Sequence, residues 1–214
     1  MTNTWQEYQN KSEEIKKYFF YIKNNESLIS SDLLKILKAN LFLMLYNLVE
    51  SCIRNSLEEI HNAITNENIS YNNTIDEIKA LWIEYNYKKF TQKNATSITE
   101  IINNIAIDKI IIDYSDYITK TKNNDISGNI DGQKIRKIAD KYCIEKNRRV
   151  NGYKLLIIKN TRNRLAHGEV TFSEIGQNYS LNELDIIRKE CKIYLKEFLI
   201  NVENYINLKK FIKT

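Results

Sequence analysis

The apolar residues of the chain recur at three- and four-residue steps over several long stretches, which is the period of an α-helix. The clearest stripe follows Ser30 and consists of Leu33, Leu34, Leu37, Leu41, Met44, Leu45, Leu48 and Cys52. Ser30 or Ser31 can cap this helix, and it is expected to continue to about Thr65. A second long stripe spans residues 180–211 and consists of Leu184, Ile187, Cys191, Leu195, Phe198, Val202, Tyr205 and Leu208. The pattern therefore predicts two long amphipathic helices.

Shorter amphipathic helices are predicted around the first long one. The N-terminal helix would turn one apolar side inward, formed by Trp5, Tyr8, Ile15, Tyr18, Phe19 and Ile22. Another would run from Thr74 to about Phe90, with Ile75, Ile78, Trp82 and Tyr85 on one side. Residues 98–118 are predicted to form a further helix, although the consecutive isoleucines at 110–112 suit a β-strand as well.

Two more helices are predicted from residues that favour helix ends. Asp131 is placed to cap a helix that starts near Gly132, because a carboxylate accepts hydrogen bonds from the first backbone amides. The next helix would cover residues 153–167. Gly168 follows it at the position where a left-handed residue commonly ends a helix.

The expected architecture is an all-α antiparallel bundle of about six helices, two of them long, in a single domain over residues 1–214. No fixed-period repeat is visible, which disfavours a solenoid. The chain has no proline and only five glycines, which disfavours a turn-rich β-sandwich. With 43% hydrophobic and 28% charged residues, the composition suits one closed core rather than disorder.

The net charge of +5 is unevenly distributed along the chain. Residues 134–164 contain eleven basic and two acidic side chains, which makes this segment +9 and the remainder −4. A local excess of this size attracts polyanions such as nucleic acid. A solvated helix face that keeps the protein soluble is the alternative interpretation of the same charges.

We expect a cytoplasmic protein with no membrane span, no cofactor and no metal site. Residues 1–10 lack the pattern of a secretory signal, and the longest apolar run, 41–45, is far shorter than the ~18–20 residues that cross a bilayer. The three cysteines, Cys52, Cys143 and Cys191, are widely separated and are predicted to be buried thiols. The two histidines do not show the spacing of metal ligands.

The candidate chemistry lies at the end of the basic segment. Residues 160–168 read Asn-Thr-Arg-Asn-Arg-Leu-Ala-His-Gly, with four residues between Arg162 and His167. This string resembles the R-N-x-L-A-H-G motif of one bacterial branch, the MAE type, of the HEPN superfamily of helical-bundle ribonucleases. Further landmarks of the resemblance are Lys38-Ala39-Asn40, Tyr46-Asn47, Glu50, Gly128 to Asp131, Lys134 to Arg136, Phe172 and Gly176. Residues 69–122 match nothing in the branch and are interpreted as a family-variable insertion.

The resemblance implies a metal-independent endoribonuclease that works as a homodimer with a composite active site. It also implies a toxin or phage-defence setting, with an antitoxin or sensor protein as a partner. His167 would move protons, because an unperturbed imidazole titrates near neutral pH. Arg162 would stabilise the phosphate with a fork of donors, and Asn163 would be the orienting group.

Helix geometry constrains these roles. Asn163 and His167 are one turn apart and share a face, so Asn163 is placed to orient the imidazole or to contact the phosphate. Arg162 is about 140° from His167 and must reach round the helix or use distortion at the helix end. The predicted RNA contacts outside the motif are Arg164, Lys159, Arg148, Arg149 and Lys154. Glu50 and Asn47, with Asn40 on the same helix face, would either support the motif from behind or form a buried polar network.

Three alternatives remain open at this point. Arg54 and His61 also fit the loose Arg–His spacing, but they would be about 10 Å apart along the helix axis and are interpreted as surface or interface residues. The protein could also be a non-catalytic helical module that binds RNA or a partner, with the motif capping and pairing helices. A DNA-binding function rests on the basic segment alone.

Overall fold

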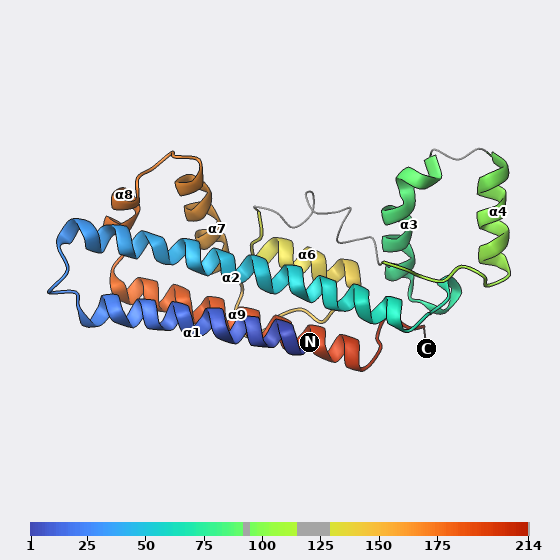
Figure 1. Ribbon diagram of the computed structural model, residues 1–214, viewed down its shortest axis with the longest axis horizontal. Coiled ribbons are helices and arrows are strands. Elements are labelled where there is room, and N and C mark those ends of the chain that lie inside the picture. Colours follow the sequence, from blue (N-terminus) through green and yellow to red (C-terminus); the bar gives the residue numbers. More distant parts are fainter. Residues whose placement is uncertain (92–94, 115–128, 214) are drawn as a thin grey trace.

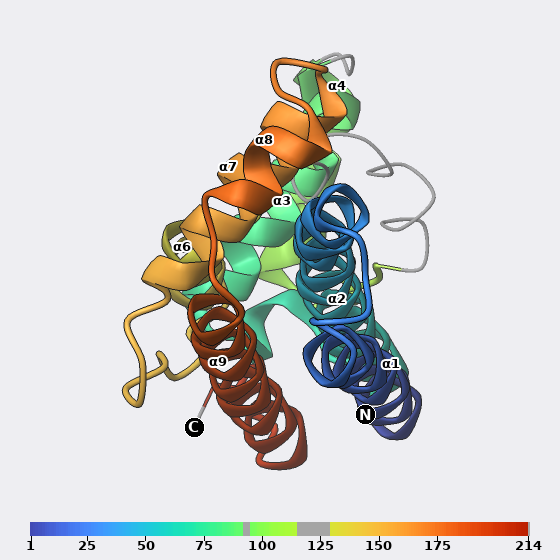
Figure 2. The same ribbon diagram turned by 90° about the vertical axis from the view of Figure 1, so that its left-hand side faces the viewer.

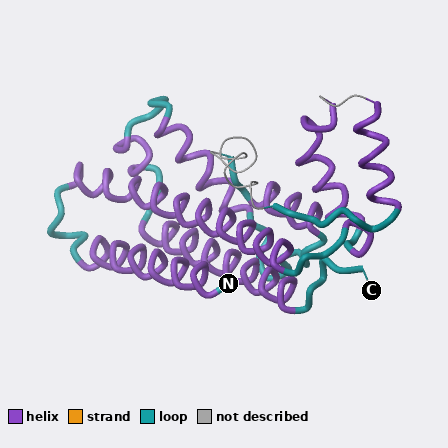
Figure 3. Tube along the Cα trace, turned by 45° about the vertical axis from the view of Figure 1, so that its right-hand side comes forward, coloured by secondary structure: helices purple, strands orange, loops and turns teal. Residues whose placement is uncertain are grey.

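The computed structural model describes residues 1–91, 95–114 and 129–213. Within these ranges the chain forms eight α-helices (Figure 1). They are α1 (Thr2–Asn24), α2 (Ser31–Asn66), α3 (Asp76–Thr91), α4 (Ala95–Ala106), α6 (Gly132–Tyr142), α7 (Tyr153–Ala166), α8 (Phe172–Gln177) and α9 (Leu181–Asn207), with a 3-10 turn η1 (Tyr71–Asn73). The residues coloured in Figure 3 are helices and loops without a strand, so the all-α prediction is confirmed.

The helix α2 is the centre of the bundle. It packs against α1, α7, α8 and α9. The helices α1, α2 and α9 extend along the long axis, and α1 runs antiparallel to the other two (Figure 1). Seen from the end, α6, α7 and α8 form a layer on one side, over α2 and α9 (Figure 2). The helices α3 and α4 lie together beyond the C-terminal end of α2.

The predicted apolar stripes form the core. On α2 the buried members include Leu41, Leu45, Leu48 and Cys52, while Leu33 near the start of the helix is exposed. On α9 every stripe residue from Leu184 to Tyr205 is buried, and Leu208, just beyond the helix, is exposed. The N-terminal stripe on α1 is likewise buried at Tyr8, Ile15, Phe19 and Ile22. Burial of these side chains supplies the main driving force for folding.

The helix boundaries agree with the predicted caps to within a few residues. Ser30 occupies the N-cap position of α2, although its side chain does not make the capping hydrogen bond. Ser180 caps α9 through a capping box, in which its hydroxyl accepts from the Glu183 amide and the Glu183 carboxylate accepts from the Ser180 amide. The short helix α8 was not predicted from the sequence pattern, and α1 is nearly as long as α9.

The prediction of a helix over residues 98–118 is correct only for its first part. After α4 the chain becomes extended, and Ile111 forms an isolated antiparallel bridge with Ser70. The Tyr71 amide donates to the Ile110 carbonyl, and the Ile112 amide donates to the Ile69 carbonyl. Ile112 is buried while Ile111 is exposed, so these β-branched residues alternate as in a strand. Residues 115–118 of the prediction lie outside the described residues.

The buried-thiol prediction is confirmed for two cysteines and wrong for the third. Cys52 and Cys191 are buried, and burial raises the pKa of Cys52 to about 12. Cys143 is exposed. It ends α6 in a left-handed conformation with φ of 57°, just where the chain leaves the core after the buried Tyr142.

One described helix, α2, is long and apolar enough to cross a bilayer by length and composition. Its most apolar 18-residue window has a mean hydropathy of 1.4, and 56% of that window is buried inside the structure. A core helix meets the same criterion, and α2 has the packing of a core helix.

Candidate functional site

The motif lies at the C-terminal end of α7. The amides of Gly168 and Glu169 donate to the carbonyls of Leu165 and Arg164 at 3.2 and 3.0 Å, which is the pairing of a Schellman cap. Gly168 has φ of 68°, so the predicted left-handed helix end is confirmed. His167 is the C-cap residue and is exposed. The cap therefore fixes the backbone of His167 while leaving the imidazole open to solvent.

Arg162 turns away from the outer face of α7 and toward α2. Its Cζ atom lies 4.3 Å from the centre of the Tyr46 ring. Tyr46 is fully buried in α2, and its hydroxyl accepts a hydrogen bond of 3.3 Å from the Ile130 amide. Burial raises the pKa of Tyr46, which keeps the hydroxyl neutral. An aromatic face attracts a guanidinium, so the Tyr46 ring holds the Arg162 side chain by a cation–π contact.

Asn163 connects Arg162 to the start of α6. Arg162 Nη1 donates to Asn163 Oδ1 at 2.9 Å, and Asn163 Nδ2 donates to Asn129 Oδ1 at 3.1 Å. The bond from the His167 amide to the Asn163 carbonyl is the ordinary helical one, at 2.9 Å. The side chain of Asn163 thus orients the guanidinium of Arg162, whereas the sequence suggested the imidazole or the phosphate as its target.

A second contact holds α6 against α7. Lys159 Nζ lies 2.6 Å from Asp131 Oδ2, and the two side chains are only 18% and 11% exposed. Asp131 also accepts from the Lys134 amide, as the predicted N-cap of α6. Burial alone would raise the pKa of Asp131, but the hydrogen bonds from Lys159 and from the Lys134 amide outweigh it and hold that pKa below its usual value. Lys159 therefore joins two helices, and its predicted role as an RNA contact stays a prediction.

The starts of α6 and α7 touch through their backbones. A Cβ atom on Gly132 would lie 2.8 Å from the Gly152 carbonyl oxygen, closer than real contacts allow. The buried Tyr194 donates from its hydroxyl to the Gly132 carbonyl at 3.3 Å. This close approach sets the position of Asn129 and Asp131 relative to α7.

The other predicted RNA contacts lie at both ends of α7 and in the loop before it. Arg164 is exposed beside the motif. Lys154 lies in the first turn of α7, and Arg148 and Arg149 are exposed in the preceding loop. With a rise of about 1.5 Å per residue, Lys154 and His167 are about 20 Å apart along the helix.

The landmarks on α2 surround Tyr46. Glu50 lies one turn after Tyr46, and its Oε1 is 3.5 Å from Arg54 Nη2. The Glu50 carboxylate is close enough to contribute to the raised pKa of Tyr46, and Arg162 acts in the opposite direction. Asn47 is exposed, which rules out a fully buried polar network at this place. Sequence reasoning matched Tyr46 and Asn129 to the family but assigned no role to either.

The alternative pair of Arg54 and His61 does not form a site. His61 is buried, and its Nε2 lies 2.7 Å from the Tyr142 hydroxyl. Its ring stacks on Tyr114 with 4.7 Å between ring centres, and burial lowers the pKa of His61 to about 3. The prediction of a surface or interface role is wrong for His61, because Tyr114 and Tyr142 from distant segments cover that side of α2. Arg54 is exposed and pairs with Glu50.

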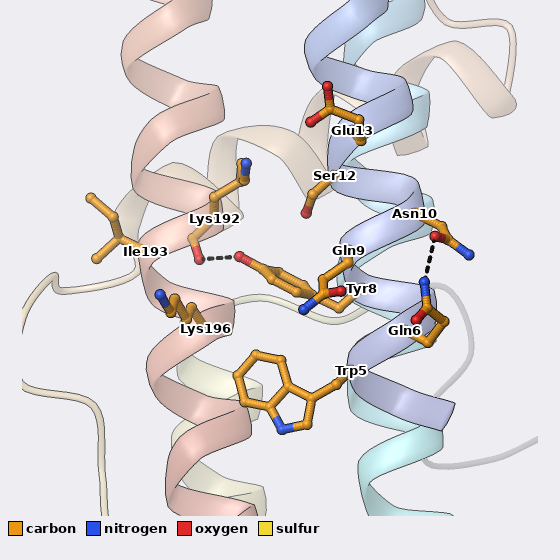
Figure 4. A pocket seen from close by; sticks show the side chains of 10 residues that line it. All are labelled: Trp5, Gln6, Tyr8, Gln9, Asn10, Ser12, Glu13, Lys192, Ile193 and Lys196. Atoms are coloured by element: carbon orange, nitrogen blue, oxygen red, sulfur yellow. Dashed lines mark hydrogen bonds between the residues drawn. The ribbon is translucent and has the colours of Figure 1, made fainter. Parts of the chain in front are cut away.

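An open groove of about 570 Å³ lies elsewhere, between α1 and α9 (Figure 4). Trp5, Tyr8, Lys192 and Ile193 are among its lining residues, and the Tyr8 hydroxyl donates to the Lys192 carbonyl at 3.1 Å. None of its lining residues belongs to the motif. In the part of the chain that the structure describes, no group of three or more His, Cys, Asp or Glu side chains is arranged to hold a metal ion.

Comparison with known proteins gave one result that bears on this site. A family model described as HEPN_MAE_28990:/-like HEPN matches residues 2–211. The match includes residues 69–122, for which the sequence showed no recognisable resemblance. No curated protein and no solved structure matches the chain.

Proposed function

Since the chain belongs to the HEPN_MAE_28990-like HEPN family, we propose that it is a metal-independent endoribonuclease. The observation that carries this proposal is the arrangement around Arg162. A guanidinium seated on a buried ring and bonded to Asn163 lies one to two turns before an exposed histidine. A cation held in a fixed position and an exposed histidine on the same helix are two groups that phosphodiester transesterification can use.

In the proposed reaction the ribose 2′-oxygen attacks the adjacent phosphorus. His167 accepts the 2′-OH proton, and Arg162 stabilises the negative charge that builds up on the five-coordinate phosphate. The bond from phosphorus to the 5′-oxygen then breaks, and the departing 5′-oxygen receives a proton. The products are a 2′,3′-cyclic phosphate and a 5′-hydroxyl end.

A homodimer would supply the second proton-transfer group. The motif of one chain contains a single histidine, whereas the reaction uses a base and an acid. Two copies related by a twofold axis would place His167 of each on opposite sides of one phosphate. The exposed position of His167 at the tip of α7 supports this assembly.

The proposed setting is a toxin or phage-defence effector in the cytoplasm, restrained by an antitoxin or sensor protein. The second candidate function is a non-catalytic module that binds RNA or a partner. The bonds from Arg162 to Asn163 and from Asn163 to Asn129 favour that candidate, because they join α7 to the segment before α6 whether or not RNA is cut.

The decisive experiment incubates purified protein with labelled single-stranded RNA in EDTA and analyses the product ends. The nuclease proposal predicts 2′,3′-cyclic phosphate ends from the wild type. It also predicts that folded His167→Ala and Arg162→Ala variants cut at least ~100-fold more slowly. Binding without cutting would favour the non-catalytic module. Cutting only after divalent metal is added would contradict the proposed mechanism.

A further inference from the structure

An exposed tyrosine begins the helix that carries the motif. Tyr153 is the first residue of α7 and is 59% exposed. Its backbone amide donates to the Asn151 side chain at 2.9 Å, which anchors the start of the helix. Single exposed aromatic residues are common on protein surfaces, so exposure alone does not indicate a function. The residues around Tyr153 distinguish it from such a surface residue.

Tyr153 shares one face of α7 with the motif histidine. Tyr153, Asn160, Arg164 and His167 fall within about 60° of each other at 100° per residue, and all four are exposed. We call these four residues the outer stripe. Tyr153 and His167 mark its two ends, about 21 Å apart along the axis. A strand bound at His167 can therefore continue along the outer stripe to Tyr153.

The loop before Tyr153 presents arginine side chains from a fixed backbone. This loop, residues 143–152, is called the arginine loop below. The amides of Arg148 and Arg149 both donate to the Glu197 carboxylate on α9, at 2.9 and 3.1 Å. Asn147 Nδ2 donates to the Tyr194 carbonyl at 2.7 Å. These contacts tie down the main chain. The Arg148 and Arg149 side chains remain exposed, and Arg148 Nη2 pairs with Glu145 Oε1 at 3.1 Å.

Gly152 fixes the direction in which the arginine loop enters α7. It has φ of 77°, and a Cβ atom there would lie 2.8 Å from the Tyr194 ring. Arg136 Nη1 also donates to the Asn151 carbonyl at 2.7 Å. The arginine loop projects from the side of the molecule that the α6–α7 layer covers (Figure 2). The backbone that carries Arg148, Arg149 and Tyr153 is thus held in place before the first turn of α7.

We propose that the outer stripe and the arginine loop bind the part of a single-stranded RNA that extends away from the cleavage site. Tyr153 stacks on an unpaired base, and Arg148 and Arg149 contact backbone phosphates. Arg148, Arg149 and Arg164 are exposed cations of the arginine loop and the outer stripe, which suits a polyanion, and the outer stripe is continuous with the motif. A duplex fits less well, because its bases already stack on one another and offer no free face to a tyrosine ring. The assignment of RNA as ligand rests on the proposed nuclease function.

The first test measures binding in a His167→Ala background, where the strand is not cut. The probe is a fluorescent single-stranded RNA long enough to reach from His167 to the arginine loop, and the readout is fluorescence anisotropy. Tyr153→Ala should weaken binding by about 5- to 100-fold, because stacking on one aromatic residue contributes that much. Tyr153→Trp should retain the affinity. Tyr21→Ala is the matched control, since Tyr21 is 60% exposed on α1, and it should bind like the parent.

The second test concerns the arginine loop. Replacing Arg148 and Arg149 together with alanine should make the negative slope of log affinity against log salt less steep by about 1.4, since each phosphate contact on a single strand contributes about −0.7. The matched control replaces Lys17 and Lys23, two exposed cations of α1, and should leave the slope unchanged.

Several outcomes would overturn the proposed RNA surface. The first is that Tyr153→Ala binds the RNA as tightly as the parent, and the second is that Tyr21→Ala weakens binding as much as Tyr153→Ala does. The third is that Tyr153→Ala weakens the binding of duplex DNA as much as that of single-stranded RNA. The fourth is that replacing Tyr153 changes the oligomeric mass. The RNA surface and the nuclease proposal can fail separately. If the wild type cuts no RNA but binding still depends on Tyr153, the surface stands and the nuclease proposal fails. If the wild type cuts RNA and Tyr153→Ala binds and cuts like the parent, the nuclease proposal stands and the proposed surface fails.

Discussion

The guanidinium of Arg162 on α7 lies over the buried ring of Tyr46 on α2, with 4.3 Å between Cζ and the ring centre. Arg162 is about 140° from His167 on the helix, so its side chain needs a support other than α7 itself. Tyr46 provides it, because a ring with no exposed surface cannot move away from the cation. The site is thus built across two helices that are far apart in the sequence.

Two replacements of Tyr46 distinguish the contribution of its ring from that of its hydroxyl. Tyr46→Phe should keep kcat near the wild-type value and cost about 1 kcal/mol of stability, because the Ile130 amide loses its acceptor. Tyr46→Leu should lower kcat about 10-fold, because the cation–π contact is lost. Steady-state kinetics below the unfolding temperature, together with thermal unfolding, check both. Tyr205→Leu, at another buried tyrosine, is the control and should lose stability while keeping the wild-type kcat. A wild-type kcat for Tyr46→Leu would contradict the role of Tyr46 as the support of Arg162.

Asn129 should matter only through Asn163. Asn129→Ala and Asn163→Ala should each lower kcat by about 3- to 30-fold, because the first frees the Asn163 amide that holds the Arg162 guanidinium and the second removes it. The double variant should be no worse than Asn163→Ala, since residues in one hydrogen-bonded chain are not additive. Asn3→Ala, at an exposed position of α1, is the control. Fully additive losses would show that Asn129 acts independently of Asn163.

Lys159 and Arg164 should respond differently to the same substitution. Lys159→Ala should lower the free energy of unfolding by about 1–2 kcal/mol, because it leaves the largely buried Asp131 carboxylate without its partner. Arg164→Ala should leave stability unchanged and raise KM, because that side chain is exposed beside the motif. Chemical denaturation and steady-state kinetics of both variants provide the comparison. A Lys159→Ala variant that keeps its stability but has a raised KM would instead support the predicted RNA contact of Lys159.

Buried His61 should make the fold less stable in mild acid. Burial lowers its pKa to about 3, whereas in the unfolded chain histidine titrates near 6.5. Between these values the unfolded state binds the extra proton, so stability falls as the pH drops below about 6.5, by up to ~1.4 kcal/mol per pH unit. Urea denaturation between about pH 7 and pH 5 measures this slope. His61→Phe should flatten it, and an equally steep slope in that variant would exclude His61 as the cause.

Much of the fold could be predicted from local signals. The apolar stripes identified α1, α2 and α9, and Asp131 and Gly168 marked helix ends where the structure has them. These features depend on a few neighbouring residues, which a sequence displays directly. The position of the motif at the end of α7 could be read for the same reason.

The remaining features depend on contacts between distant segments. Nothing local to α2 indicates that Tyr46 lies under Arg162, or that Tyr114 and Tyr142 bury His61. The extended run at Ile110–Ile112 is decided by its pairing with residues 69–71. Lys159 looked like one more cation in a basic segment, and only the approach of Asp131 makes it a helix-to-helix contact.

The most direct measurement compares two labelled single-stranded RNAs in EDTA, identical except for one 2′-deoxyribose at the cleaved position. Wild-type protein should cut the all-ribose strand and leave a 2′,3′-cyclic phosphate. It should not cut the other strand at that position, because the attacking oxygen is missing. Equal cleavage of both strands, or cleavage of neither, would contradict 2′-OH transesterification by Arg162 and His167.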